Sequence, residues 1–228
     1  MANANENTVD RKNQLNGDKI YFLKSDGEVG GKETKVLIFG NSITRHGVKP
    51  EIGWTHDFGM AASKKENDYV HVLFDKMSKA GLNPNFLVSH ASYYEANFYK
   101  DEALNFLSVE RDFKPDILIL RLGDNVHSGE YDGLLIPAFE SLINACATKA
   151  TRVIVTGSYF VNENIEPLLK ELSDKNGYKF VDLSDISLNP ENTGGKENFW
   201  HEGVAMHPGD KGMRIIADRL FNAIVKEF

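Results

Sequence analysis

The 228-residue sequence lacks the marks of several large classes of protein. It contains one cysteine, Cys146, which excludes both an internal disulfide framework and a cluster of thiolate metal ligands. No apolar run approaches the roughly 20 residues that a membrane-spanning helix needs, and no run of Lys and Arg marks a nucleic-acid-binding surface. The formal net charge of −7 also disfavours nucleic acid as a partner. We therefore expect neither a membrane nor a nucleic acid among the partners of this protein.

The amino-terminal residues also lack the apolar core of a signal peptide, so the chain as given is expected to be cytoplasmic. Residues 1–16 are rich in Asn and charge and show no hydrophobic period, which predicts a disordered tail. Residues 17–34 contain the short apolar run 19–23 followed by turn-forming residues, and we expect an extra edge strand or hairpin there. Cys146 lies in an apolar helical context, where we expect a small buried core residue.

The remainder of the sequence, residues 17–228, is typical of one globular domain that is long enough to bury a substantial core. From residue 35 onward, short apolar runs alternate five times with segments of helical periodicity. The apolar runs, which predict buried strands, are 36–39, 86–88, 117–120, 153–155 and 179–182. The segments with helical spacing are 70–81, 98–109, 131–149, 166–175 and 208–226. This alternation predicts an α/β fold: a three-layer α/β/α sandwich of flavodoxin-like type with a five-stranded parallel sheet.

The first buried strand ends at Gly40, and Asn41, Ser42 and Thr44 follow directly. Glycine permits a sharp turn, and small polar residues leave a hydroxyl and backbone N–H groups open to solvent at the carboxyl end of the strand. In open α/β sheets, ligands bind at that end of the strands. Ser42 is therefore a candidate nucleophile. The alternative is a serine that only caps a turn or a helix.

Partners for Ser42 occur in loops that the predicted topology brings to the same edge of the sheet. His207 immediately precedes the last helix, and histidine is the usual base that takes the proton of a serine at neutral pH. The oxyanion of a tetrahedral intermediate needs N–H donors. The candidates are the backbone of Ser42, the backbone of Ala91 or Ser92, and the amide of Asn125. These residue types together are suited to acyl transfer.

Three blocks of the sequence resemble those of the SGNH, or GDSL-type, hydrolases, and they span most of the chain from about residue 36. The segment 40–44, Gly-Asn-Ser-Ile-Thr, is similar to the first block, with Asn41 in place of the more usual Asp. The segment 123–126, Gly-Asp-Asn-Val, is similar to the Gly-x-Asn-Asp block, with Val126 in place of its Asp. The pair 207–208, His-Pro, is similar to the terminal block.

The resemblance implies the fold of that family, a serine esterase activity and no cofactor. It also implies Ser42 as the nucleophile, His207 as its base and Asn125 as an oxyanion donor. The second block of the family supplies an oxyanion glycine, which this chain lacks. Because a backbone N–H does not require glycine, Ala91 or Ser92 takes that place.

The acid of a catalytic triad is the largest departure from the family. The family places an Asp three residues before the histidine, and here that position is Val204. Glu202 lies five residues before His207 and is the candidate acid. Asp210 lies in the first turn of the last helix, where a carboxylate is favourable without any catalytic role. If Glu202 does not reach the imidazole, a backbone carbonyl orients His207 in a Ser-His dyad.

Several residues in these loops are candidates for substrate binding: Asn41, Trp54, Tyr93, Gly123 and Asp124. The aromatic residues, which include Tyr94 and Trp200, form either a sugar platform or an acyl pocket, or else they only pack the long loops. The charged residues Arg45, Arg121 and Glu95 are also expected near the site. They either bind polar substrate groups or pair with each other.

The other six histidines do not predict a metal site. No two of them have the i, i+4 helical spacing of zinc enzymes, and we interpret them as scattered surface and loop residues. They are His46, His56, His71, His90, His127 and His201.

The sequence therefore favours a serine esterase that removes a small acyl group, most simply acetyl, from a carbohydrate or a similar polar substrate. Two alternatives stay open. One is an O-acyltransferase, since transfer to a sugar uses the same acyl-enzyme. The other is a non-catalytic module that binds glycans or a partner protein. A flavodoxin-like nucleotide or flavin binder is disfavoured, because no Gly-rich phosphate loop follows the first strand.

Overall fold

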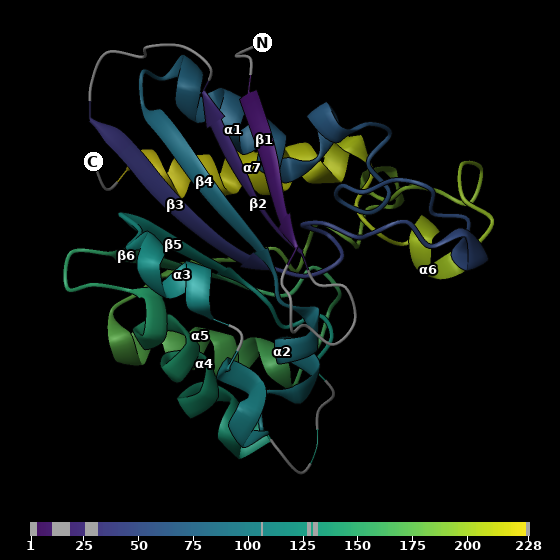
Figure 1. The fold of residues 1–228 in the computed structure, drawn as a ribbon. Coiled ribbons are helices and arrows are strands. Elements are labelled where there is room, and N and C mark those ends of the chain that lie inside the picture. The colour runs from purple at the N-terminus through teal and green to yellow at the C-terminus, as the bar shows by residue number, and fades with distance from the viewer. Residues whose placement is uncertain are drawn as a thin grey trace.

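The computed structural model describes residues 4–10, 19–25, 32–105, 107–126, 129 and 132–226. A seven-stranded sheet in the order β1-β2-β4-β3-β5-β6-β7 forms its centre (Figure 1). The strands are β1 (Ala4–Asp10), β2 (Lys19–Ser25), β3 (Glu33–Gly40), β4 (Asn83–His90), β5 (Ile117–Arg121), β6 (Arg152–Thr156) and β7 (Lys179–Val181). The strands β3 to β7 run parallel, whereas β1 and β2 are antiparallel additions beside β4. The five predicted parallel strands are confirmed within a larger sheet.

Strand β3 occupies the middle of the sheet and is covered on both faces. Val36 and Ile38 belong to one hydrophobic core, and Leu37 and Phe39 belong to the other. All four side chains are fully buried. Successive residues of a strand point to opposite faces, so an apolar run without alternation has to lie between two layers of helices.

The helices form those two layers. They are α1 (Tyr69–Lys79), α2 (Ser92–Asn97), α3 (Ser108–Phe113), α4 (Asp132–Cys146), α5 (Ile165–Asn176), α6 (Glu202–Ala205) and α7 (Asp210–Val225). Helices α1 and α7 cover one face of the sheet, and α2 to α5 cover the other (Figure 1). The predicted three-layer α/β/α sandwich is therefore confirmed. Cys146, at the end of α4, is buried as expected.

The long segments beside the sheet contain short 3₁₀ helices: Pro50–Ile52, Lys65–Asn67, Asp101–Leu104 and Pro190–Asn192. Two of these segments, one after β3 and one before α7, pack on each other through a small separate core. Its buried members are Trp54, Met60, Ala61 and Val204. None of the helices in the described ranges is long and apolar enough to cross a membrane.

Strand β1 corrects the expectation of a disordered tail over residues 1–16. Residues 4–10 pair with β2 along its whole length, while 1–3 and 11–16 lie outside the described residues. An open strand edge presents unpaired N–H and C=O groups. A polar segment can satisfy these groups through its main chain alone, so hydrophobic pattern does not reveal it. Within 17–34, the expected extra strand is present as β2, but it does not lie at the edge, because β1 pairs with its other side.

The predicted continuous helix over 98–109 is wrong. Helix α2 ends before this range, at Asn97, and the range itself contains the 3₁₀ helix Asp101–Leu104 and the start of α3. Phe98, Ala103 and Leu107 are nevertheless buried against the same core. Their spacing reports which residues face the protein interior, but it does not show that the backbone between them is one helix.

Candidate active site

The turn after β3 places Ser42 at the carboxyl end of the central strand. The backbone N–H groups of Thr44 and Arg45 both donate to the carbonyl of Asn41, at 2.9 and 3.0 Å. A Cβ on Gly40 would collide with the Thr44 side chain, whose hydroxyl lies 2.7 Å from that of Tyr69. Glycine is therefore required where the chain folds back on the strand. Ser42 itself is half-buried.

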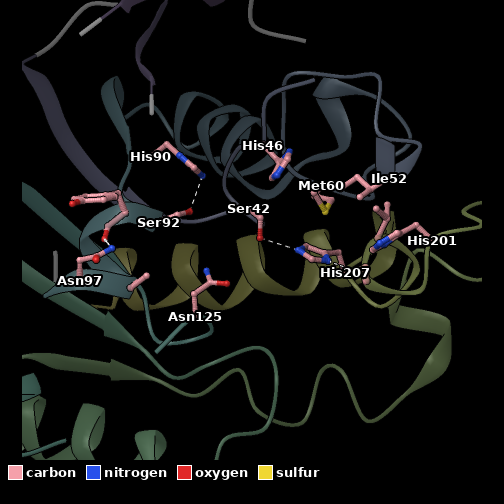
Figure 2. A pocket seen from close by; sticks show the side chains of 14 residues that line it. Ser42, His46, Ile52, Met60, His90, Ser92, Asn97, Asn125, His201 and His207 are labelled. Carbon is pink, nitrogen blue, oxygen red and sulfur yellow. Dashed lines mark hydrogen bonds between the residues drawn. The ribbon is translucent and has the colours of Figure 1, made fainter. Parts of the chain in front are cut away.

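His207 meets Ser42 directly. The Oγ of Ser42 lies 2.8 Å from Nε2 of His207 (Figure 2). The other ring nitrogen, Nδ1, lies 2.6 Å from the carbonyl oxygen of Gly203. A carbonyl only accepts hydrogen bonds, so Nδ1 carries the proton and Nε2 is left to accept the hydroxyl proton of Ser42. This tautomer is the one that a general base requires.

The acceptor for His207 comes from the end of the short helix α6. The last carbonyl groups of a helix have no partner within it. The backbone N–H of His207 donates to Val204 at 3.0 Å, which leaves the carbonyl of Gly203 to the imidazole. Local helix termination thus positions the base.

The surroundings of His207 keep its ring neutral. Burial lowers the pKa of His207 to about 4, and the Gly203 carbonyl and the Asp124 carboxylate act in the opposite direction without reversing the effect. Since the ordinary histidine pKa is near 6.5, the imidazole is available as a base well into the acidic range.

The structure does not bring Glu202, the candidate acid, to His207. Its carboxylate lies on the surface, 69% exposed, and pairs with Lys196 at 2.8 Å. Asp210 accepts hydrogen bonds from Ser63 and Asn67 instead. Val204, at the family's acid position, is buried in the small core with Trp54. Within the described part of the chain, no carboxylate is hydrogen-bonded to His207. The dyad arrangement, with a backbone carbonyl behind the ring, is the one observed.

On the other side of Ser42, the geometry separates the two oxyanion candidates that the sequence left open. The backbone N–H of Ala91 donates to the carbonyl of Gly40 at 2.7 Å, so it is not free to bind an oxyanion. Ser92 begins α2 and lines the pocket. No hydrogen bond from its backbone N–H to another described residue is present. Asn125 lines the same pocket and lies below Ser42 in Figure 2.

A buried polar network supports Asn125. The Glu95 carboxylate accepts from the backbone N–H of Gly123, from the backbone N–H of Asn125 at 3.2 Å and from Asn125 Nδ2 at 2.7 Å. Asn41 Nδ2 lies 3.2 and 3.3 Å from its two oxygens. Burial raises the pKa of Glu95, and nearby Asp124 adds to this rise, while the N–H donors lower it.

Arg121 and Asp124 complete this network. Arg121 Nη1 donates to Asp124 and to Asn41 Oδ1, both at 2.7 Å. Asp124 also accepts from the backbone of Tyr159 and Phe160. Burial favours a higher pKa for Asp124, but Arg121 and the N–H donors outweigh it and hold the pKa below its usual value. Arg121 thus pairs with Asp124, which is not one of the pairings among Arg45, Arg121 and Glu95 that the sequence suggested.

Three residues that we expected to bind substrate belong to this network instead. The side chains of Asn41 and Asp124 form buried hydrogen bonds within the protein, and neither residue lines the pocket. Gly123 is buried with φ of +136°, and its N–H donates to Glu95. The polar atoms of these residues already have protein partners. The residues therefore support the site and are not left to bind substrate.

The pocket around Ser42 has a volume of about 420 Å³. Its lining includes Tyr93, as expected, together with Ile52 and Met60. Trp54 is not at this wall. It is fully buried and donates from Nε1 to the carbonyl of His46 at 3.1 Å, so it packs the long loop.

Two other residues expected near the site, Tyr94 and Arg45, have protein partners of their own. Tyr94 is buried and donates to the carbonyl of Ala138. Arg45 is 4% exposed and forms a two-pronged pair with Asp57. Trp200, by contrast, is 73% exposed. Its ring contacts the ring of His201, which lines the pocket.

Three of the histidines interpreted as scattered line the pocket: His46, His90 and His201 (Figure 2). Their positions follow from loops that converge only in three dimensions, so no spacing in the sequence reveals them. No group of residues in the described ranges is arranged to hold a metal ion. His127 lies outside the described residues.

Comparisons with known proteins agree with this geometry at the level of the fold. No family model matches the sequence, and a search of curated proteins gives no match. Among solved structures, a protein described as a GDSL-like lipase from Parabacteroides merdae has a TM-score of 0.55 at 16% identity, over 84% of this chain and 95% of that one. A two-domain esterase active on acetylated mannans has a TM-score of 0.55 at 15% identity, over 87% of this chain and 50% of that one.

A third solved structure, the alpha/beta hydrolase enzyme LAE5 from the metagenome of Lake Arreo in Spain, gives a TM-score of 0.55. Its identity is 19%, over 86% of this chain and 97% of that one. The chain therefore has the fold of the SGNH, or GDSL-type, hydrolases. Ser42, Asn125 and His207 lie at the carboxyl edge of its sheet, as the three sequence blocks imply.

Proposed function

We propose that the protein is a serine esterase that removes a small acyl group from a polar substrate. The observation that carries this proposal is the contact between Ser42 Oγ and His207 Nε2, with Nδ1 held by the Gly203 carbonyl. A serine that only capped a turn would not need a neutral imidazole at 2.8 Å, oriented to accept its proton. The same contact disfavours a non-catalytic binding module.

The reaction follows from these positions. Ser42 Oγ attacks the acyl carbonyl carbon while its proton passes to His207 Nε2. The Ser42 and Ser92 backbone N–H groups and the Asn125 amide stabilise the oxyanion. The bond to the alcohol then breaks, and the alcohol takes the proton from His207. Water, deprotonated by His207, attacks the acyl-serine and releases the carboxylic acid and free Ser42.

We propose acetyl as the acyl group and a carbohydrate as the alcohol. The pocket, of about 420 Å³, is lined by four histidines and other polar side chains together with the apolar side chains of Ile52, Met60 and Val204, and the polar groups favour a short acyl group over a long chain. Trp200 offers an exposed ring beside the pocket, where a sugar ring can stack. A structural neighbour that is active on acetylated mannans supports the same substrate class.

The test combines turnover with covalent labelling. Wild-type protein and Ser42→Ala are assayed with acetyl and octanoyl chromogenic esters, and intact mass is measured after treatment with a serine-reactive phosphonate. We expect one adduct on Ser42, faster turnover of the acetyl ester, and no turnover by Ser42→Ala. Ser141→Ala, on exposed helix surface, is the matched serine control. Absence of both adduct and Ser42-dependent turnover would overturn the proposal.

A further inference from the structure

Glu95 is a fully buried acid, and among the described residues every hydrogen-bond partner of its carboxylate is a donor. Around it lie the backbone N–H groups of Gly123 and Asn125, the Asn125 amide and the Asn41 amide. A protonated carboxyl group has to donate one hydrogen bond, and none of these groups can accept it. These hydrogen bonds therefore favour the carboxylate form, although burial and nearby Asp124 raise the pKa of the group.

The contact with Asn125 determines which way its amide faces. The two ends of an asparagine amide have nearly the same shape, so only hydrogen-bond partners distinguish them. Glu95 Oε2 accepts at 2.7 Å, and it can do so only from the NH₂ group. One N–H of Asn125 then binds Glu95, and the second N–H remains for the pocket that this residue lines.

We propose that Glu95 is the positioning residue of the oxyanion hole: it locks the Asn125 amide so that its NH₂ group, not its carbonyl oxygen, serves the reaction. This inference rests on the proposed esterase function. Asn41 and Val126 stand where the SGNH blocks carry Asp, and in this chain the carboxylate next to Asn125 comes from α2.

A glutamine at position 95 is the informative variant. It keeps the size of the side chain but replaces one acceptor oxygen with an NH₂ donor. Facing the Asn125 amide, this donor favours rotation of that amide, which would turn its carbonyl oxygen towards the oxyanion. Glu95→Gln should therefore lower kcat by about a hundredfold, as loss of one oxyanion donor does, while KM changes by less than about threefold.

The experiment is a double-mutant cycle of Glu95→Gln and Asn125→Ala, with kcat and KM for an acetyl ester and Tm for each variant. If Glu95 acts through Asn125, Glu95→Gln lowers kcat in the wild-type background but changes it by less than about threefold when Asn125 is already alanine. Glu110→Gln is the matched control. Glu110 is also fully buried and binds Ser89, but it does not line the pocket, so its variant lowers Tm without the loss of kcat.

Three outcomes would overturn the inference: equal losses of kcat in both backgrounds, a loss confined to KM, or unchanged kcat in Glu95→Gln. Glu95→Asp, which retains an acceptor-only group, is the rescue variant and should keep kcat closer to wild type than Glu95→Gln. If Glu95→Gln does not fold, Glu95→Ala, which removes the acceptor, takes its place in the cycle. The cycle is independent of the test of Ser42. A wild-type protein without Ser42-dependent turnover removes the proposed function, whereas normal turnover with an additive cycle removes only the role of Glu95.

Discussion

The two sides of Ser42 are built in opposite ways. On the side of the base, His207 is half-buried and supported by one backbone carbonyl. On the side of the oxyanion, Asn125 rests on a network in which Glu95 and Arg121 are fully buried and the Asp124 side chain is 4% exposed. The site therefore does not lack carboxylates. They lie beneath the oxyanion donors instead of behind the imidazole.

This difference reflects what the base and the oxyanion donor each require from their hydrogen-bond partners. A neutral imidazole needs one acceptor to fix its tautomer, and a carbonyl oxygen provides it without a charge. An amide that has to present NH₂ needs an acceptor, and an ionised carboxylate only accepts. The two sides are linked through Phe160. Its backbone N–H donates to Asp124 at 2.9 Å, and its ring contacts His207 with 5.4 Å between centroids.

Removing the base gives the largest expected effect. His207→Ala should lower kcat by roughly 10⁴-fold or more, since the serine then loses its proton acceptor. The Glu95–Asn125 side remains intact, so KM should change little. Turnover is measured with an acetyl chromogenic ester, and circular dichroism verifies the fold. A residual kcat above about one tenth of wild type would show that another group acts as the base.

In the described part of the chain, no carboxylate is hydrogen-bonded to His207, so the pH dependence of activity tests how the base side of the site differs from the oxyanion side. Since burial lowers the pKa of His207 to about 4, the neutral base form persists as the pH falls from 7 to 5. We expect kcat/KM for a neutral ester to decline only near pH 4. With the ordinary pKa near 6.5, activity at pH 5 would be lower by about thirtyfold. A pH profile with its acid limb between 6 and 7 would contradict this prediction.

Trp200 lies outside both sides of the site and should affect only larger substrates. Trp200→Ala is expected to raise KM for an acetylated oligosaccharide by about three- to tenfold, which corresponds to the loss of one aromatic contact. Turnover of a small chromogenic ester should be unchanged, because that substrate does not extend past the pocket. Equal effects on both substrates would indicate that Trp200 supports the fold of the loop. Leu188→Ala, another exposed apolar residue, is the control.

Glu202→Ala should have the smallest effect. Glu202 pairs with Lys196 on the surface, and such pairs contribute little to stability. We expect kcat/KM within twofold of wild type. Steady-state kinetics with the acetyl ester decide the matter, and a loss of tenfold or more would restore Glu202 as the acid of a triad.

The fold was largely predictable because the strands of a parallel sheet are buried on both faces. Runs such as 36–39 and 117–120 are apolar throughout, and few structures besides a doubly covered strand produce this pattern in so short a segment. Strand β1 was not predictable, because main-chain pairing at a sheet edge leaves no hydrophobic signal. The break between α2 and α3 was missed for a related reason: periodicity reports burial and not backbone continuity.

The site was predictable only where side chains carry it in recognisable blocks. Ser42, Asn125 and His207 belong to such blocks, and the structure brings all three to one pocket. The acceptor behind His207 is a carbonyl oxygen, which every residue possesses and which no sequence pattern marks. Glu95 lies in the segment Ser-Tyr-Tyr-Glu-Ala-Asn, and the sequence placed it near the site without showing that its carboxylate is buried. Its burial depends on partners about 30 residues away along the chain.

The carbonyl of Gly203 also determines how the site tolerates genetic change. A single codon change can remove the acid of a conventional triad, but it cannot remove a main-chain oxygen, so the acceptor atom for the imidazole is present whichever residue stands at that position. Its weakness is of another kind. The contact depends on the four-residue separation of Gly203 and His207. Insertion or deletion of one residue in that interval would therefore inactivate the protein, although all of its catalytic side chains would still be present.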